Sequence, residues 1–167
     1  MSETSPGRNA VVDSGPIIAL SILGRLELLQ MTFQRVAITP AIRDELTVFP
    51  DRPGAGELED TPWIVVDTPN REVEPLLRHE LGAGEVEVIQ VARETGATPI
   101  LDDRKARRIA EIAYGLEPRG TVGLLIEANR HGAIPTIAPE LRRLREAGYR
   151  LSDRLVALAL RAVDEEP

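Results

Sequence analysis

Short apolar runs that alternate with helical segments constrain the fold more than any other feature of this sequence. The runs lie at Ala10–Asp13, Arg35–Ile38, Trp63–Asp67 and Thr98–Leu101, with a further short strand expected near Arg119. Strands that are buried on both faces are continuously apolar, and strands that alternate with helices form parallel sheets. We therefore predict an α/β fold, a three-layer α/β/α sandwich around a central parallel sheet.

Capping residues mark the ends of the predicted helices. Thr39 and Pro40 suit a helix start, Thr121 and Ser152 suit N-caps, and Gly96 is a natural stop. The proline-, glycine- and acid-rich segment from Phe49 to Thr61 is predicted to be a loop. Helices are expected from about Ile17 to Leu26, after Pro40, near Pro75, over 84–96, from Asp103 to Ala113, and over Val122–His131, Pro139–Ala147 and Ser152–Val163.

The length and composition indicate one domain over residues 1–167, with residues 1–9 and 164–167 frayed. A chain of 167 residues with 43% hydrophobic residues can build one core. The absence of cysteine excludes disulfides and thiolate-bound metals. The N-terminus lacks the order of a signal peptide, and no apolar run approaches the roughly 20 residues that cross a bilayer. We expect a cytoplasmic protein with no membrane segment.

Acidic side chains occur where the predicted strands end. Asp13 closes the first strand, Asp102 and Asp103 follow the fourth, and Glu45 and Glu85 lie in neighbouring helices. Open parallel sheets bind ligands outside the carboxyl ends of their strands, so these acids can reach one edge. Clustered carboxylates suit Mg²⁺ or Mn²⁺, and such ions serve phosphoryl chemistry. The acids are therefore candidate metal ligands.

Each acid also has a structural explanation. Asp13 and Asp103 precede helices and can act as N-caps, and Glu45 can be a solvated surface residue. Glu85 lies at the head of an apolar stripe that should pack on the sheet, where a charge needs a partner or a metal. Glu87 lies off this stripe and is expected at the surface.

Several ordered segments resemble motifs of the PIN-domain nucleases, specifically a subgroup related to the VapC toxins of prokaryotic toxin–antitoxin pairs. They are VVDSGPIIALSILGRLELL, ITPAIRDEL, GEVEVIQVA, ILDDRKARRIAE and GTVGLLIEANRHGAI, and the resemblance extends from about Asn9 to Leu160. It implies a Rossmann-like sandwich, Mg²⁺ or Mn²⁺, and endonucleolytic cleavage of RNA. It also implies a homodimer and a cognate antitoxin as protein partners.

The resemblance assigns the acids of the family to Asp13, Glu45, Glu85 and Asp103 as catalytic and metal-binding residues. The toxins commonly have aspartate where this chain has Glu85. The DDRKAR segment replaces a threonine-containing turn, so Asp102 and Asp103 remain rival ligands.

A basic cluster begins the helix beside the predicted metal site. We expect Arg104, Lys105, Arg107 and Arg108 to contact the RNA backbone, although ion pairing with the acids is an alternative. A net charge of −7 argues against broad adhesion to nucleic acid. Aromatic residues make up only 3% of the chain, so we expect recognition of backbone shape and charge without base stacking.

Other functions remain open at this point. One is a non-catalytic RNA-binding or regulatory module that keeps the fold, and another is a DNA or flap nuclease. Metal-dependent cleavage separates the first from a ribonuclease, and matched RNA and DNA substrates separate the second. Apolar residues early in the chain, including Ile17, Ile22, Leu23 and Leu28, are expected to be mostly core.

Overall fold

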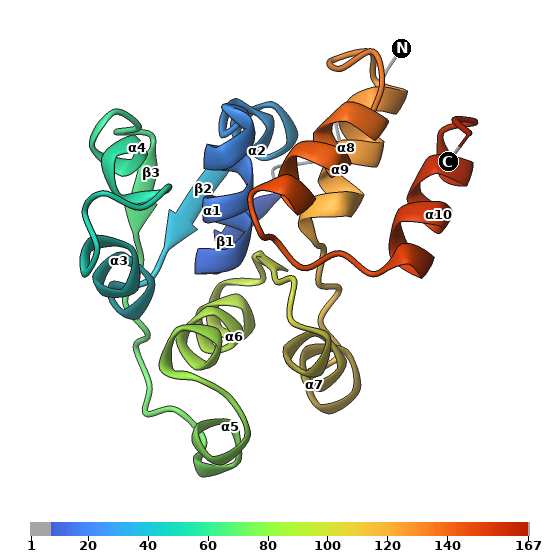
Figure 1. Cartoon of the computed structure of the whole chain (residues 1–167). Coiled ribbons are helices and arrows are strands. Elements are labelled where there is room, and N and C mark those ends of the chain that lie inside the picture. The colour runs from blue at the N-terminus through green and yellow to red at the C-terminus, as the bar shows by residue number, and fades with distance from the viewer. Residues whose placement is uncertain (1–7, 167) are drawn as a thin grey trace.

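A parallel sheet of four strands forms the centre of the protein in the computed structural model, which describes residues 8–166. The strands are β1 (Asn9–Val12), β2 (Arg35–Ile38), β3 (Ile64–Val66) and β4 (Thr98–Ile100), in the order β3-β2-β1-β4. Val11 pairs with Ala37 on one side and with Pro99 on the other. The predicted α/β fold with a central parallel sheet is confirmed (Figure 1).

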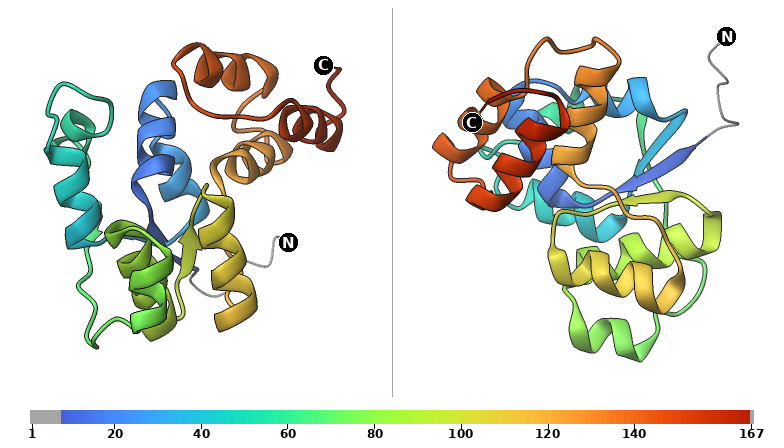
Figure 2. Two further views of the ribbon diagram at one scale, coloured as in Figure 1. Left: turned by 60° about the horizontal axis from the view of Figure 1, so that its bottom comes forward. Right: turned by 90° about the vertical axis from the view of Figure 1, so that its right-hand side faces the viewer.

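Helices cover both faces of this sheet (Figures 1 and 2). In the view of Figure 1, α5, α6 and α7 lie below the sheet, whereas α2 and α8 lie above it, and α1 contacts α8. The helices are α1 (Ser14–Leu23), α2 (Glu27–Thr32), α3 (Pro40–Thr47), α4 (Ala55–Glu59), α5 (Pro75–Glu80), α6 (Ala83–Thr95), α7 (Arg104–Tyr114), α8 (Thr121–Arg130), α9 (Ala138–Glu146) and α10 (Asp153–Ala162).

The core fills the space between the sheet and these helices. α6 packs on β1 and β4, and α2 packs on β2. The early apolar residues are mostly core as expected, with Ile17, Leu23 and Leu28 buried and Ile22 half-buried. Other large side chains that are fully buried include Leu20, Leu29, Ile42, Leu77, Ile89, Ile100, Leu101, Leu124, Leu125, Ile134 and Ile137.

The carboxyl ends of β1 and β4 lie side by side and bring the start of α8 to the same edge. The Asp13 amide donates to the Ile100 carbonyl at 3.0 Å, so the first residue after β1 is fixed to the end of β4. The Leu101 amide donates to the Arg119 carbonyl at 2.8 Å. The strand expected near Arg119 is a single bridge to Ile100.

Three local expectations were wrong. Gly24 adopts a left-handed conformation (φ 65°), so the helix expected from about Ile17 to Leu26 ends at Leu23 as α1, and the separate helix α2 was not expected. The segment expected as a loop from Phe49 contains α4. Thr121 is the first residue of α8 rather than its cap, which is Gly120.

Residues at both ends of the described chain, where the sequence predicts fraying, make specific contacts. Asn9 pairs with Arg35 in the sheet. The Glu165 carboxylate accepts from the amides of Ile137 at 2.8 Å and Ala138 at 2.9 Å. The expectation for residues 1–7 and 167 lies outside the described residues. None of the helices within 8–166 has the length and apolar character needed to cross a membrane.

Candidate active site

Asp13 lies at the carboxyl end of β1 with 8% of its surface exposed. It occupies the N-cap position of α1, but its side chain makes no capping hydrogen bond. The alternative role of Asp13 as a helix cap is therefore wrong. Burial raises its pKa to about 7; the Ser14 amide lowers it, and the carboxylates of Glu85, Glu45 and Asp102 raise it further. The site therefore opposes a negative charge at the residue where the sequence predicts a metal ligand.

Glu85 and Glu45 come together because Gly84 has no side chain. The Glu45 Oε1 atom lies 2.5 Å from the point where a Cβ on Gly84 would be, although Glu45 is otherwise exposed. Glu85 is half-buried in the first turn of α6, and its Oε2 accepts from the Gly82 amide at 3.2 Å. Burial raises the pKa of Glu85; the Gly82 amide lowers it, and Asp103 and Glu45 raise it.

Asp102 is occupied by hydrogen bonds from the other side of the site. Its Oδ1 accepts from the Thr121 amide at 2.7 Å, and its Oδ2 accepts from the Thr121 hydroxyl at 2.6 Å and from the Tyr149 hydroxyl. Burial, followed by the Asp102 charge, raises the pKa of Tyr149. The Asp102 carboxylate thus joins β4 to the start of α8 and to the loop between α9 and α10.

Asp103 is the N-cap of α7, as its structural alternative predicted. Its Oδ1 accepts from the Ala106 amide at 2.8 Å. The side chain is exposed, and its charge acts on Glu85 across the site. Its Oδ2 makes no hydrogen bond to residues 8–166, so capping leaves one oxygen for another ligand.

The structure thus brings the predicted acids close enough for their charges to raise the pKa values of Asp13 and Glu85, but not into a ready-made metal site. Asp13 is affected by Glu85, Glu45 and Asp102, and Glu85 is affected by Asp103. Within residues 8–166, no three His, Cys, Asp or Glu side chains form a group that could hold a metal ion.

The basic cluster of α7 divides between two surfaces. Arg107 lines a cavity together with Asp102. Lys105 pairs with Glu80 at 2.6 Å, and not with an acid of the site as the ion-pair alternative predicted. Lys105 and Arg108 border an apolar groove with Leu76. Among the predicted basic residues, Arg107 is therefore the one that faces the Asp102 side of the site.

Sequence reasoning missed three residues that shape the site. Thr121 and Tyr149 hold Asp102, and no spacing or motif connects either residue to it. Glu87 was expected at the surface, but it is half-buried and its Oε2 accepts from the Ala41 amide at 2.9 Å. The first-turn amides of α3 have no acceptor within the helix, and such amides need one. This need is the signal from which a role for Glu87 could have been predicted.

Open parallel sheets bind ligands at the carboxyl edge of their strands, and Asp13, Asp102 and Asp103 of this protein lie at that edge. The chain belongs to the PIN-domain family: the model of the PIN-domain family DUF3368 matches residues 9–165. PIN domains are generally nucleases and typically use divalent metals, so the fold supports a nuclease-type function.

Comparison with solved structures supports the same fold. A PilT N-terminus domain protein from the hyperthermophilic archaeon Sulfolobus solfataricus is similar, with a TM-score of 0.55 and 19% sequence identity. The similarity covers 72% of this chain and 92% of that protein. No curated protein matches the sequence.

Proposed function

We propose that this protein is a divalent-metal-dependent endoribonuclease that hydrolyses RNA phosphodiester bonds. The observation that carries the proposal is the convergence of Asp13, Glu45, Glu85 and Asp103 from separate elements on one edge of a PIN-domain sheet. Clustered carboxylates repel one another, and a cation among them offsets that repulsion. A divalent ion bound among them would supply the Lewis acid for phosphodiester hydrolysis.

The residues present fit Mg²⁺ or Mn²⁺. All the donors are carboxylate oxygens, and Mg²⁺ is commonly held by one or two carboxylates and several waters. Asp13 is buried without a capping bond, and Asp103 keeps one free oxygen within the described chain. Asp13, Glu45, Glu85 and Asp103 would hold the ion, which supplies a Lewis acid for the attacking water and the leaving oxygen.

Other residues of the chain would orient the RNA. Asp102, whose oxygens already accept from Thr121 and Tyr149, would position its neighbours. The cations Arg104, Arg107 and Arg108 would contact phosphates. Lys105 can join them, because its ion pair with Glu80 is exposed and such pairs contribute little stability.

Two observations favour the non-catalytic alternative. Glu85 is engaged by the Gly82 amide, and no ready-made metal group is found among residues 8–166. A module that binds RNA without cutting it would need no such group. The competing functions are therefore tested together.

The test is cleavage of a mixed single-stranded RNA pool with Mn²⁺, with Mg²⁺ and with chelator. The variant is Asp13→Asn, and the matched control is Asp51→Asn, an exposed aspartate outside the site. We expect metal-dependent cutting that is lost in Asp13→Asn and kept in Asp51→Asn. RNA binding without cutting would favour the non-catalytic module, and preferential cutting of matched DNA would favour a DNA nuclease.

We further propose that the protein is a toxin that forms a homodimer and binds a cognate antitoxin. The resemblance to VapC toxins supports this, as do Leu76 and Ile112, which are 57% and 72% exposed beside the apolar groove of α5 and α7. Light scattering of the wild type and of Ile112→Asp tests the homodimer. Growth arrest on expression, which should require Asp13, tests the toxin.

A further inference from the structure

A cavity of about 360 Å³ lies beside the candidate active site and shares Asp102 with it. It is formed by the end of β4, the start of α8 and the loop between α9 and α10. Gly120 lies at its base, where a Cβ would be 2.9 Å from Asp102 Oδ1 and 3.0 Å from Arg107 Nη1. Because Gly120 has no side chain, the Asp102 carboxylate and the Arg107 guanidinium can both approach its backbone.

Cations form one part of the wall of this cavity. Arg107, Arg119 and Arg150 line it together with the single acid Asp102. Arg119 pairs with Glu127, whereas Arg107 and Arg150 have no ion-pair partner within residues 8–166. The start of α8 lies here too: the Thr121 amide donates to Asp102, and the Gly120 N-cap offers no side chain to the next two amides, those of Val122 and Gly123. This part of the cavity suits an anion.

Apolar side chains form the rest of the wall. Val122 and Ile126 contribute from α8, and Leu151 and Leu155 contribute from the chain around the start of α10. Gly123 lies on the same wall, and a Cβ built on it meets no atom within 4 Å. The cavity therefore combines a cationic part with an apolar part that could cover a flat ring.

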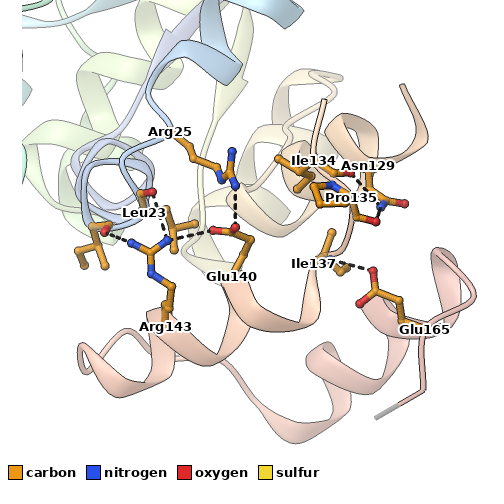
Figure 3. Close-up of polar contacts among 10 residues, drawn as sticks. Leu23, Arg25, Asn129, Ile134, Pro135, Ile137, Glu140, Arg143 and Glu165 are labelled. Atoms are coloured by element: carbon orange, nitrogen blue, oxygen red, sulfur yellow. Dashed lines mark hydrogen bonds and ion pairs between the residues drawn. The ribbon is translucent and has the colours of Figure 1, made fainter. Parts of the chain in front are cut away.

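Hydrogen bonds hold the outer wall in place. The Tyr149 hydroxyl donates to Asp102, and the Tyr149 amide donates to the Leu144 carbonyl at 2.9 Å. Figure 3 shows how α9 is attached to the region after α1: Glu140 accepts from Arg25 at 2.9 Å, and Arg143 donates to the Leu23 carbonyl at 3.4 Å. The cavity is thus already formed, as binding sites for small ligands usually are.

We infer that this cavity binds one nucleotide of the RNA, next to the bond that is cut, and so selects the base at that position. The phosphate would lie against Arg107, Arg150 and the first turn of α8. The base would lie against Ile126 and Leu155. The position of this nucleotide next to the cut bond rests on the proposed function. The inference adds recognition of a base by apolar side chains, since the few aromatic residues argue against recognition by stacking.

The test measures binding without catalysis. Nitrogen-15 spectra of the whole protein are recorded in chelator during titration with each of the four ribonucleoside 5′-monophosphates and with ribose 5-phosphate. We expect shifts at the Gly120, Thr121 and Gly123 amides, and tighter binding of at least one nucleotide than of ribose 5-phosphate. Equal binding of ribose 5-phosphate and all four nucleotides, or no shift at these amides, would overturn the inference.

Gly123→Leu fills the cavity, and Gly56→Leu is the matched control. Both glycines are helical, and a Cβ on either meets nothing within 4 Å. Neither change should lower the melting temperature, because leucine favours helices more than glycine does. We expect Gly123→Leu to weaken nucleotide binding by about tenfold or more through steric exclusion, with the control unchanged. Equal binding by both variants would contradict the assignment.

The outcome is separable from that of the proposed function. Nucleotide binding at α8 without any metal-dependent cleavage would support this site and remove the nuclease proposal. Cleavage with no nucleotide binding, and with the same base preference in Gly123→Leu, would support the nuclease and overturn this site.

Discussion

A buried carboxyl group surrounded by other carboxyl groups makes a folded protein sensitive to pH, and Asp13 is such a residue. Its pKa is about 7 in the folded protein against an ordinary value of 3.8. Between these values the folded state binds more protons than the unfolded state does. The stability contributed by protonated Asp13 is therefore present below about pH 4 and lost as the pH rises to about 7.

We predict that Asp13→Asn removes this pH dependence. At about pH 8 in chelator, the variant should be more stable than the wild type by at most about 4 kcal/mol, because each pKa unit corresponds to about 1.4 kcal/mol. Near pH 4 the difference should disappear. Urea unfolding at several pH values measures the difference in unfolding free energy between the two proteins, with Asp51→Asn as control. Parallel stability profiles of the wild type and Asp13→Asn would contradict the raised pKa.

Asp102 and Asp103, adjacent in sequence, should respond differently to substitution. Asp103→Asn should leave the unfolding free energy within about 0.5 kcal/mol of the wild type, because asparagine also caps helices. Asp102→Ala should lower it by about 1–3 kcal/mol, since the Thr121 amide and the Tyr149 hydroxyl lose their acceptor. The unfolding is measured at about pH 5, where Asp13 is protonated, so that loss of the repulsion between Asp13 and Asp102 does not add to the result.

Cleavage assays of the same positions separate the rival ligands. Under the proposed mechanism, Asp103→Asn abolishes cutting although the protein stays folded. Asp102→Asn should keep part of the activity, because its amide can donate to the hydroxyls of Thr121 and Tyr149, which are also acceptors. The reverse pattern would make Asp102 the metal ligand.

At the scale of helices and strands, periodic apolar residues were enough to predict most of the architecture. The four predicted strands other than the one near Arg119 form within a residue of their expected bounds, because apolar runs buried on both faces have few other solutions. The end of α1 before Gly24 was missed because apolar residues continue past it to Leu26. The packing of α9 could not be predicted, since it depends on Glu140 contacting Arg25 across 115 residues of sequence.

α9 provides the prediction at this scale. Glu140 is 6% exposed, and Arg25 is partly exposed. Glu140→Ala should lower the unfolding free energy by about 2 kcal/mol, because removing one partner leaves the other charge uncompensated. Glu140→Gln should have a smaller effect, since the amide oxygen can still accept from Arg25. Urea unfolding measures both, and hydrogen exchange should show faster opening of α9.

Glu146→Ala is the matched control, because Glu146 is an exposed glutamate on the same helix. If Glu140→Ala is no more destabilising than Glu146→Ala, the contact to Arg25 does not hold α9. If it is destabilising but nucleotide binding is unchanged, α9 does not shape the cavity.

Across the whole molecule, charge is distributed unevenly. The net charge is −7, yet Arg107, Arg119 and Arg150 gather around one cavity, next to the acids of the candidate site. The sequence indicated Asp13, Asp102 and Asp103 because they follow strands, and it indicated Arg107 because it follows these acids. It could not indicate Arg150 or Tyr149, whose positions depend on how the chain returns to β4 after α9.

This distribution predicts a weak dependence of RNA binding on salt. With Asp13→Asn in chelator, which prevents cleavage, the logarithm of the binding constant for single-stranded RNA should fall against the logarithm of salt concentration with a slope of about −2 to −3. That slope corresponds to about three or four phosphate contacts at about −0.7 each. Adding Arg107→Ala should reduce its magnitude by about 0.7. Arg142→Ala, at an exposed arginine of α9, should leave it unchanged. An equal loss in both variants would mean that RNA is attracted by the general surface, and an unchanged slope in Arg107→Ala would place the phosphate path elsewhere.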